Sequence, residues 1–305
     1  MNKILKLTRK LLGIQHVRQQ IAQVRYDLRA TQLQEHILYD LASGTSEKKY
    51  FPYQVIVSLT TFGRRLDSVA ITIESLMQQT LRANKIVLWL DERLRGGEIP
   101  LSLQNQEKRG LEVRYCKDIR SYKKLVPSLR VYPEDAILTV DDDVIYPYDL
   151  IERFIREHRQ NPHLVLCSKH HRMKIGADGK LAPYKEWEKG SPILDASIFN
   201  FPTGVGGVFY PPHCLDEEVL NENVFMEICT SADDIWFKAM AMKKGILSKR
   251  ISSHSANGTD YIEDMEVQDI GLFHQNVEKD YNDEQIKAVF TRYNLYQLLM
   301  QDQNG

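Results

Sequence analysis

The eight residues Ala-Ile-Leu-Thr-Val-Asp-Asp-Asp, numbered 136–143, join an apolar run to three consecutive carboxylates. A short apolar run containing β-branched residues is typical of a buried strand. Residues 136–140 are therefore predicted to form a strand that leads directly into Asp141. Three aspartates this close together repel one another, and burial makes their charge still more costly. A solvated acidic turn is one explanation, and a bound Mg²⁺ or Mn²⁺, which prefers carboxylate oxygens, is the other.

Strand-like and helix-like patterns alternate on both sides of this segment. The predicted strands lie at 54–60, 85–90 and 111–116, and the predicted helices at 122–129 and 147–159. Such alternation favours an α/β fold with a mostly parallel, Rossmann-like sheet. Ligands of these sheets bind at the carboxyl ends of the strands. Polar clusters at 60–65, 91–92 and 141–143 each follow a predicted strand, so we expect the site there.

Composition excludes several classes of function. The chain has 305 residues, of which 43 % are hydrophobic, and this suffices for a large buried core. Lys and Arg number 40 against 41 Asp and Glu, which is unlike a globally basic nucleic-acid-binding protein. The cysteines form no Cys-x-x-Cys pair, which disfavours a zinc ribbon and suits a reducing, cytoplasmic compartment. No uncharged stretch resembles a membrane span, and charges interrupt the apolar residues near the N-terminus, which is unlike a secretory signal.

Residues 1–45 differ from the main domain predicted at 50–305. Residues 1–30 contain seven basic residues and one acidic residue, and their apolar residues recur at helical spacing. This pattern predicts a basic amphipathic helix. Three interpretations stay open: a helix packed on the main domain, a coiled coil between copies, or a helix on the anionic inner face of a membrane. The apolar stripe consists of Ile4, Leu7, Leu11, Ile14, Val17, Ile21, Val24 and Leu28.

Further candidate residues lie outside the aspartate run. Asp233 and Asp234 begin a predicted helix at 232–244, where they either cap the helix or face a cleft as a base. The glycines near 204–207 lack the third glycine of a dinucleotide fingerprint, but they would let the backbone approach a ligand closely. The remaining candidates are cations suited to phosphate and histidines suited to metal, namely Arg64, Arg65, Lys123, Lys124, His254 and His274.

Taken in chain order, these segments resemble a bacterial GT-A-fold glycosyltransferase of the family-2-like or exostosin-like kind. The resemblance covers residues 50–300 and leaves out the N-terminal helix. The segments that carry it are 55–61, Asp91, 121–125, 138–143, 203–212 and 231–236.

The resemblance implies a role for each matching residue. Asp143 and His274 would hold Mn²⁺ or Mg²⁺ on the donor diphosphate, and Asp233 or Asp234 would be the catalytic carboxylate near the acceptor. UDP is the donor nucleotide expected from this fold. The residues implied to bind the nucleotide sugar are Thr60, Thr61, Arg64, Arg65, Asp91, Lys123, Asp141, Asp142, Gly206 and Gly207.

The expected function is metal-dependent transfer of a sugar to a glycan or lipid-linked acceptor, in bacterial surface polysaccharide synthesis. The chemistry agrees, because a metal and basic residues stabilise a leaving diphosphate and a carboxylate can deprotonate the acceptor hydroxyl. One alternative is a nucleotidyltransferase of sugar metabolism, although Gly63 is the only glycine in the segment 60–65. The other is a non-catalytic sugar-binding or scaffold protein, in which the N-terminal helix would be the functional part.

Overall fold

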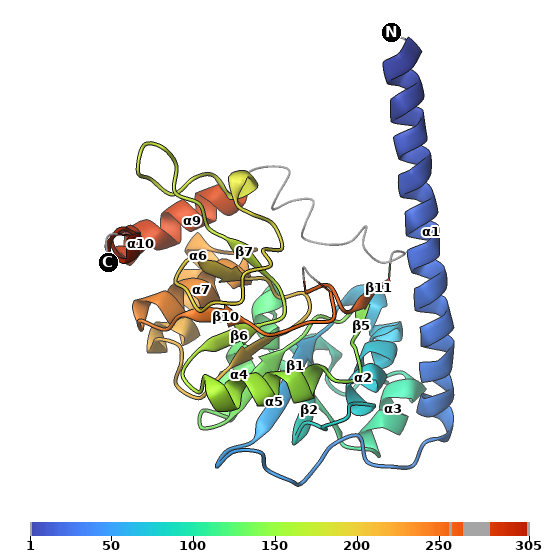
Figure 1. The fold of residues 1–305 in the computed structure, drawn as a ribbon. Helices are drawn as coiled ribbons and strands as arrows, with labels where there is room; N and C mark the ends of the chain where they lie inside the picture. The colour runs from blue at the N-terminus through green and yellow to red at the C-terminus, as the bar shows by residue number, and fades with distance from the viewer. Residues whose placement is uncertain (1, 256–257, 265–280, 304–305) are drawn as a thin grey trace.

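A computed structural model of the chain describes residues 2–255, 258–264 and 281–303 (Figure 1). In this part of the chain seven strands form the central sheet, in the spatial order β10-β6-β9-β4-β1-β2-β3. β9 runs antiparallel to its neighbours β4 and β6, and the other pairs are parallel. The predicted α/β fold with a mostly parallel sheet is therefore confirmed. The strands are β1 (Val55–Thr60), β2 (Lys85–Asp91), β3 (Leu111–Cys116), β4 (Ala136–Thr139), β6 (Val165–Cys167), β9 (Val208–Tyr210) and β10 (Ser248–Arg250).

Helices cover both faces of this sheet (Figure 1). Strand β1 explains why, because Val55, Val57 and Leu59 enter one core cluster while Ile56 enters the other. The helices on the first side are α1 (Asn2–Tyr39), α2 (Val69–Met77), α3 (Leu101–Glu107) and α5 (Leu150–Gln160). Those on the second side are α4 (Val126–Val131), α6 (Glu222–Ile228), α7 (Asp233–Lys243), α9 (Tyr281–Arg292) and α10 (Leu295–Gln303). Two small antiparallel sheets pair β5 (Val144–Ile145) with β11 (Ile262–Glu263), and β7 (His170–Arg172) with β8 (Asn200–Pro202).

Two predicted helices differ from the observed ones at proline residues. The helix expected at 147–159 begins only at Leu150, and Pro147 lies in the turn before it. The helix expected at 122–129 is divided into the 3₁₀ turn η3 (Arg120–Lys124) and α4. Pro127 lies in the first turn of α4, where its missing N–H costs least, so a new helix starts there instead of continuing η3. This division places Lys124 at the end of a turn.

Helix α1 packs on the domain with its C-terminal half, while its N-terminal end projects past the domain (Figure 1). We call the residues that make this contact the docked row; they are buried and consist of Tyr26, Ala30, Leu33 and Ile37. Those members of the predicted apolar stripe whose side chains the structure describes do not make this contact. These side chains are 51–66 % exposed. We call them the exposed row, which consists of Val17, Ile21, Val24 and Leu28.

The two rows lie on opposite sides of α1. Each residue of the docked row follows one of the exposed row by nine positions, which is about two and a half turns of an α-helix. The predicted helix is thus confirmed and packs on the domain, which was one of the three open interpretations, but through the docked row and not through the predicted stripe. No helix in the described residues is long and apolar enough to cross a membrane.

Candidate active site

The three consecutive aspartates lie beside the carboxyl end of β1. Strands β4 and β1 pair in parallel, and the Val140 N–H donates to the carbonyl oxygen of Ser58 (3.1 Å) just before Asp141. The chain continues from β1 to β2 and β3 on one side of the sheet, whereas β4 lies on the other side. Such a change of direction in strand order is where open α/β sheets bind ligands. The structure therefore brings together the predicted clusters at 60–65 and 141–143.

Arg65 joins two of the three aspartates. It belongs to the 3₁₀ turn η1 (Gly63–Asp67), which follows β1, and its side chain is buried. Its Nη1 lies 3.0 Å from Oδ1 of Asp142, and its Nη2 lies 3.0 Å from Oδ2 of Asp143. The hydroxyl of Thr72 on α2 also donates to the carbonyl oxygen of Asp142 (3.0 Å). The two Nη atoms of Arg65 thus each bind one carboxylate, and the guanidinium group fixes Asp142 and Asp143 relative to each other.

Lys124 joins the first aspartate to α7. Its Nζ lies 3.2 Å from Oδ1 of Asp141 and 3.1 Å from Oδ2 of Asp233, and the lysine is buried. The hydroxyl of Ser58 on β1 donates to the carbonyl oxygen of Lys124 (2.6 Å), which fixes η3 against the sheet. Lys124 was one of four candidate phosphate-binding cations, but the resemblance pointed to Lys123, and the structure places Lys124 in the cluster.

Asp234 faces the glycine-containing segment before β9. Its Oδ2 accepts the backbone N–H of Gly204 (3.0 Å). A Cβ on Gly204 would lie 2.6 Å from Nζ of Lys124, so a larger residue would displace the lysine. Neither Asp233 nor Asp234 forms a side-chain cap, because the N-cap residue of α7 is Ala232 and no cap hydrogen bond is made. Both carboxylates instead contact groups outside their own helix.

These residues form what we call the aspartate cluster: Asp141, Asp142, Asp143, Asp233 and Asp234 with Arg65 and Lys124. In the described part of the chain its ion pairs join two cations to four carboxylates, and the fifth, Asp234, accepts only the Gly204 N–H among the bonds given above. Burial, followed by the charge of Asp141, raises the pKa of Asp143 to about 7. Burial and the charge of Asp233 raise the pKa of Asp234 to about 7 as well. The cluster is therefore short of positive charge.

A divalent cation fits the chemistry of this cluster. Asp141 and Asp143 offer hard oxygen donors, and the pKa of Asp143 is raised by burial and then by the charge of Asp141, both of which a bound cation would offset. Among the described residues no group of three His, Cys, Asp or Glu side chains is arranged to hold a metal. Mg²⁺ commonly takes one or two carboxylates and completes its shell with water and substrate phosphates. His274, the other predicted ligand, lies outside the described residues.

Asp91 and Lys123 lie at a separate place, near the carboxyl ends of β2 and β3. Asp91 accepts hydrogen bonds from the backbone N–H and the Nε of Arg93 (both 2.9 Å), and these bonds hold the pKa of its carboxyl well below the usual range. Nζ of Lys123 lies 3.1 Å from Oδ1 of Asp118. The nucleotide contacts of Asp91 and Lys123 stay predictions. Asp91 ends β2, the strand next to β1 in the sheet, and the aspartate cluster lies at the ends of β1 and β4.

The predicted residues that follow β1 take different positions. The hydroxyl of Thr60 donates to the carbonyl oxygen of Trp89 on the neighbouring strand (2.8 Å). Thr61 is buried beside Asp142, whereas Arg64 is exposed. Thr60 therefore connects two strands, and Arg64 is the member of this group with an exposed cation.

Gly206 and Gly207 form the turn that leads into β9. Their φ angles are +91° and +101°, which favour glycine. A Cβ on Gly206 would lie 3.1 Å from the ring of Tyr261. Burial and the charge of Glu263 raise the pKa of Tyr261, with smaller contributions from Asp141 and Asp143. Nζ of Lys169 donates to the Tyr261 hydroxyl (3.3 Å), and no sequence motif marks either residue.

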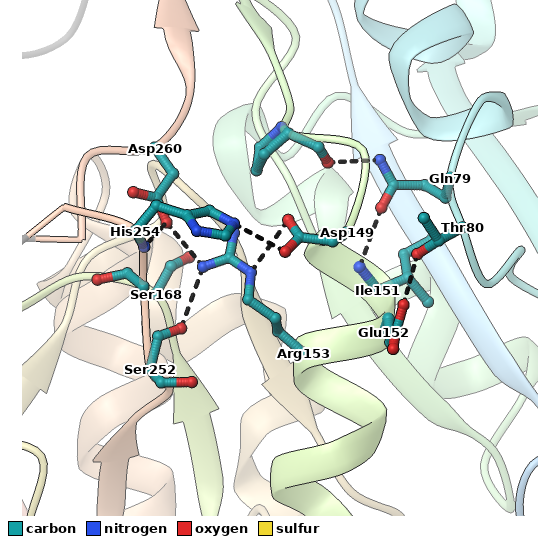
Figure 2. A network of polar contacts seen from close by, with 12 residues as sticks. Gln79, Thr80, Asp149, Ile151, Glu152, Arg153, Ser168, Ser252, His254 and Asp260 are labelled. Carbon is teal, nitrogen blue, oxygen red and sulfur yellow. Dashed lines mark hydrogen bonds and ion pairs between the residues drawn. The ribbon is translucent and has the colours of Figure 1, made fainter.

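A second group of charged residues fixes the segment that precedes Tyr261 (Figure 2). Arg153 on α5 lies between two carboxylates, with Nη1 at 2.7 Å from Oδ2 of Asp260 and Nε at 3.3 Å from Oδ1 of Asp149. Its Nη1 also donates to the carbonyl oxygen of Ser252 (3.0 Å). Nε2 of His254, a candidate metal ligand, lies 2.8 Å from Oδ2 of Asp149 instead. We call these residues, Asp149, Arg153, Ser252, His254 and Asp260, the Arg153 network.

Two solved structures are similar to part of this chain. One is CMP:2-keto-3-deoxy-manno-octonic acid synthetase complexed with CTP, with a TM-score of 0.37 and 12 % identity over 65 % of this chain and 88 % of that chain. The other is S. aureus TarS 1–349 in complex with UDP, with a TM-score of 0.44 and 16 % identity over 68 % of this chain and 59 % of that chain. No protein-family model and no curated protein matches the chain. Likenesses this distant concern the fold alone.

Proposed function

We propose that this chain is a divalent-metal-dependent glycosyltransferase, which moves a sugar from a nucleoside diphosphate sugar to a hydroxyl group of a glycan or lipid-linked acceptor. The observation that supports this proposal is the aspartate cluster at the carboxyl ends of β1 and β4. Four of its five carboxylates share two cations, and the pKa values of Asp143 and Asp234 are both raised to about 7. Such perturbed groups concentrate at functional sites.

The donor end of the proposed site contains Asp141 and Asp143. These two residues would hold Mn²⁺ or Mg²⁺, and the bound cation would neutralise charge on the leaving diphosphate. Arg65 holds the Asp143 carboxylate in place. Lys124 does the same for Asp141, so the ligands are oriented by charge-assisted hydrogen bonds before any donor arrives. A uridine nucleotide is the donor that we propose to test first.

The acceptor end contains Asp234, which we assign as the general base. Asp234 is only partly buried, while Asp233 is buried against Lys124. A carboxylate with a pKa near the working pH suits proton transfer. Asp234 would take the proton of the acceptor hydroxyl while the hydroxyl oxygen bonds to the anomeric carbon and the bond to the diphosphate breaks. The Gly204 N–H keeps the carboxylate of Asp234 oriented during this step.

The test is thermal unfolding with a panel of nucleoside diphosphates, with and without Mn²⁺. A ligand at 100 times its Kd adds about 2.7 kcal/mol, which raises the Tm of a domain this size by several degrees. We expect a Mn²⁺-dependent rise with one nucleotide, and its loss in Asp143→Asn. Asp67→Asn is the matched control, because Asp67 is an exposed carboxylate on η1 close in sequence to Arg65.

Product analysis separates the competing functions. A glycosyltransferase releases nucleoside diphosphate from a nucleotide sugar, and Asp234→Asn should lower this release far more than it lowers nucleotide binding. A nucleotidyltransferase instead releases pyrophosphate from a nucleoside triphosphate and a sugar phosphate. No shift with any nucleotide in folded protein would contradict both functions and favour a binding or scaffold protein.

A further inference from the structure

Helix α1 has two apolar rows, and in the described part of the chain its own domain covers the docked row. The exposed row faces away from the domain, with side chains 51–66 % exposed. Its members are spaced by four, three and four residues. In the sequence the same alternation continues backward through Ile14 to Leu7, with Lys10 at one position of the row. Alternating steps of three and four residues are the heptad repeat of a coiled coil.

The width of the exposed row favours a helix as its partner over a lipid surface. An interfacial membrane helix combines a broad apolar face with a polar face rich in Lys and Arg. Here polar residues border the row closely on both sides, Arg18 and Arg25 on one and Gln20 and Asp27 on the other, so the apolar face is only two residues in seven wide. A strict two-in-seven stripe is the narrow seam of a coiled coil.

Charge along α1 indicates how a second copy would align. Residues 2–25 contain six basic residues and no acidic one, whereas residues 26–40 contain Asp27, Glu35 and Asp40 with a single arginine. Parallel pairing would place the basic halves side by side. Asp40 is paired with Arg109 of its own domain. Antiparallel pairing places the basic half of each helix against the half of the other that carries Asp27 and Glu35, and this charge complementarity favours that orientation.

We propose that two copies of this chain associate through antiparallel pairing of α1, with the exposed row in the seam. The docked row lies on the opposite side of the helix, so each copy keeps α1 bound to its own domain when it pairs. The proposal does not rest on the proposed function, because it uses no residue of the aspartate cluster.

The experiment is sedimentation equilibrium of the full chain over a wide range of concentration. We expect the mass to rise toward twice 35.4 kDa. The double variant Ile21→Gln, Val24→Gln should weaken association at least ten-fold with an unchanged Tm, because both side chains are exposed in the single copy. Gln19→Ala is the control, since position 19 lies on the side of α1 away from the exposed row. A wild-type mass of 35.4 kDa at every concentration, or an unaffected double variant, would overturn the proposal.

Two further measurements test the partner and the orientation. A monomeric wild type that co-sediments with phosphatidylglycerol vesicles, and a double variant that does not, would assign the row to a membrane and overturn the proposal. In an antiparallel pair centred near residue 19, position 31 lies opposite position 7. Leu7→Cys mixed with Thr31→Cys should therefore form a disulfide-linked dimer. Cross-linking of Thr31→Cys to itself would overturn the antiparallel arrangement.

Discussion

The aspartate cluster and the Arg153 network are two places in the described part of this molecule where carboxylates surround a buried cation. In the network, hydrogen bonds from Ser255 and His254 and the charge of Arg153 outweigh burial and hold the pKa of Asp260 below its usual value. In the cluster, burial and neighbouring aspartates outweigh Arg65 and raise the pKa of Asp143 to about 7. The same residue types therefore reach opposite electrostatic states, according to how many donors and how many like charges surround each carboxylate.

This difference separates a structural group from a candidate catalytic one. A carboxylate that accepts several hydrogen bonds and pairs with a cation stabilises the fold in its charged form, without a bound ligand or metal ion. A carboxylate crowded by others remains costly until a proton or a cation arrives. The comparison predicts that substitutions in the Arg153 network change stability, whereas substitutions at Asp143 change ligand binding.

The largest effect is expected from Lys124→Met. Removing the lysine leaves Asp141 and Asp233 without their shared cation in a buried place. Breaking a buried ion pair from one side costs roughly 3–5 kcal/mol. Thermal unfolding at pH 7.5 and pH 5 measures this loss, which should be smaller at pH 5, where the crowded aspartates take up protons. An equal loss at both values would show that repulsion among the aspartates is not the cause.

Arg153→Met should destabilise the protein by about 3 kcal/mol, the low end of that range, because Asp149 is less deeply buried than Asp260. Chemical denaturation measures the change in the free energy of unfolding. Nucleotide binding in the folded variant should be unchanged. Loss of nucleotide binding at temperatures where the variant is folded would remove the distinction between the two groups.

Asp143→Asn should alter the pH dependence of stability more than stability itself. The folded-state pKa of Asp143 is raised to about 7, so its contribution to stability is fully present below the unfolded value near 3.8 and is lost as pH rises through 7. The variant lacks this titration, so metal-free protein should gain on the order of 1 kcal/mol at pH 7.5 relative to wild type. Denaturation curves from pH 4 to pH 8 would reveal it, and parallel curves for the two proteins would contradict it.

The smallest effect is expected from His254→Ala. His254 is largely exposed, and exposed ion pairs contribute about 0–1 kcal/mol. The free energy of unfolding should therefore fall by less than 1 kcal/mol. A Mn²⁺-dependent nucleotide shift as large as that of wild type would agree with the position of His254 in the network. Loss of that shift would restore His254 as a metal ligand.

Local patterns predicted the framework of the fold but not the contacts that complete the site. Strands β1 to β4 follow from apolar runs, and the position of Asp141 at a strand end follows from topology. The ion pair between Lys124 and Asp233 depends on how η3 and α7 approach each other across the sheet, and no spacing in the sequence encodes that approach. Tyr261 and Lys169 come from irregular segments for the same reason. The exposed row was found as a stripe, but periodicity cannot tell which side of a helix meets its domain.

The position of Lys124 between Asp141 and Asp233 also constrains which substitutions this protein can accept during evolution. The turn η3, the segment after β4 and the start of α7 each supply one member of this group of charges. Losing Lys124 would leave two carboxylates without their shared cation, and a second substitution that removes one of the carboxylates would then reduce the excess of negative charge. Across descendants of a common ancestor, positions 124, 141 and 233 should therefore be inherited as a set, while Gly204 beside them stays small.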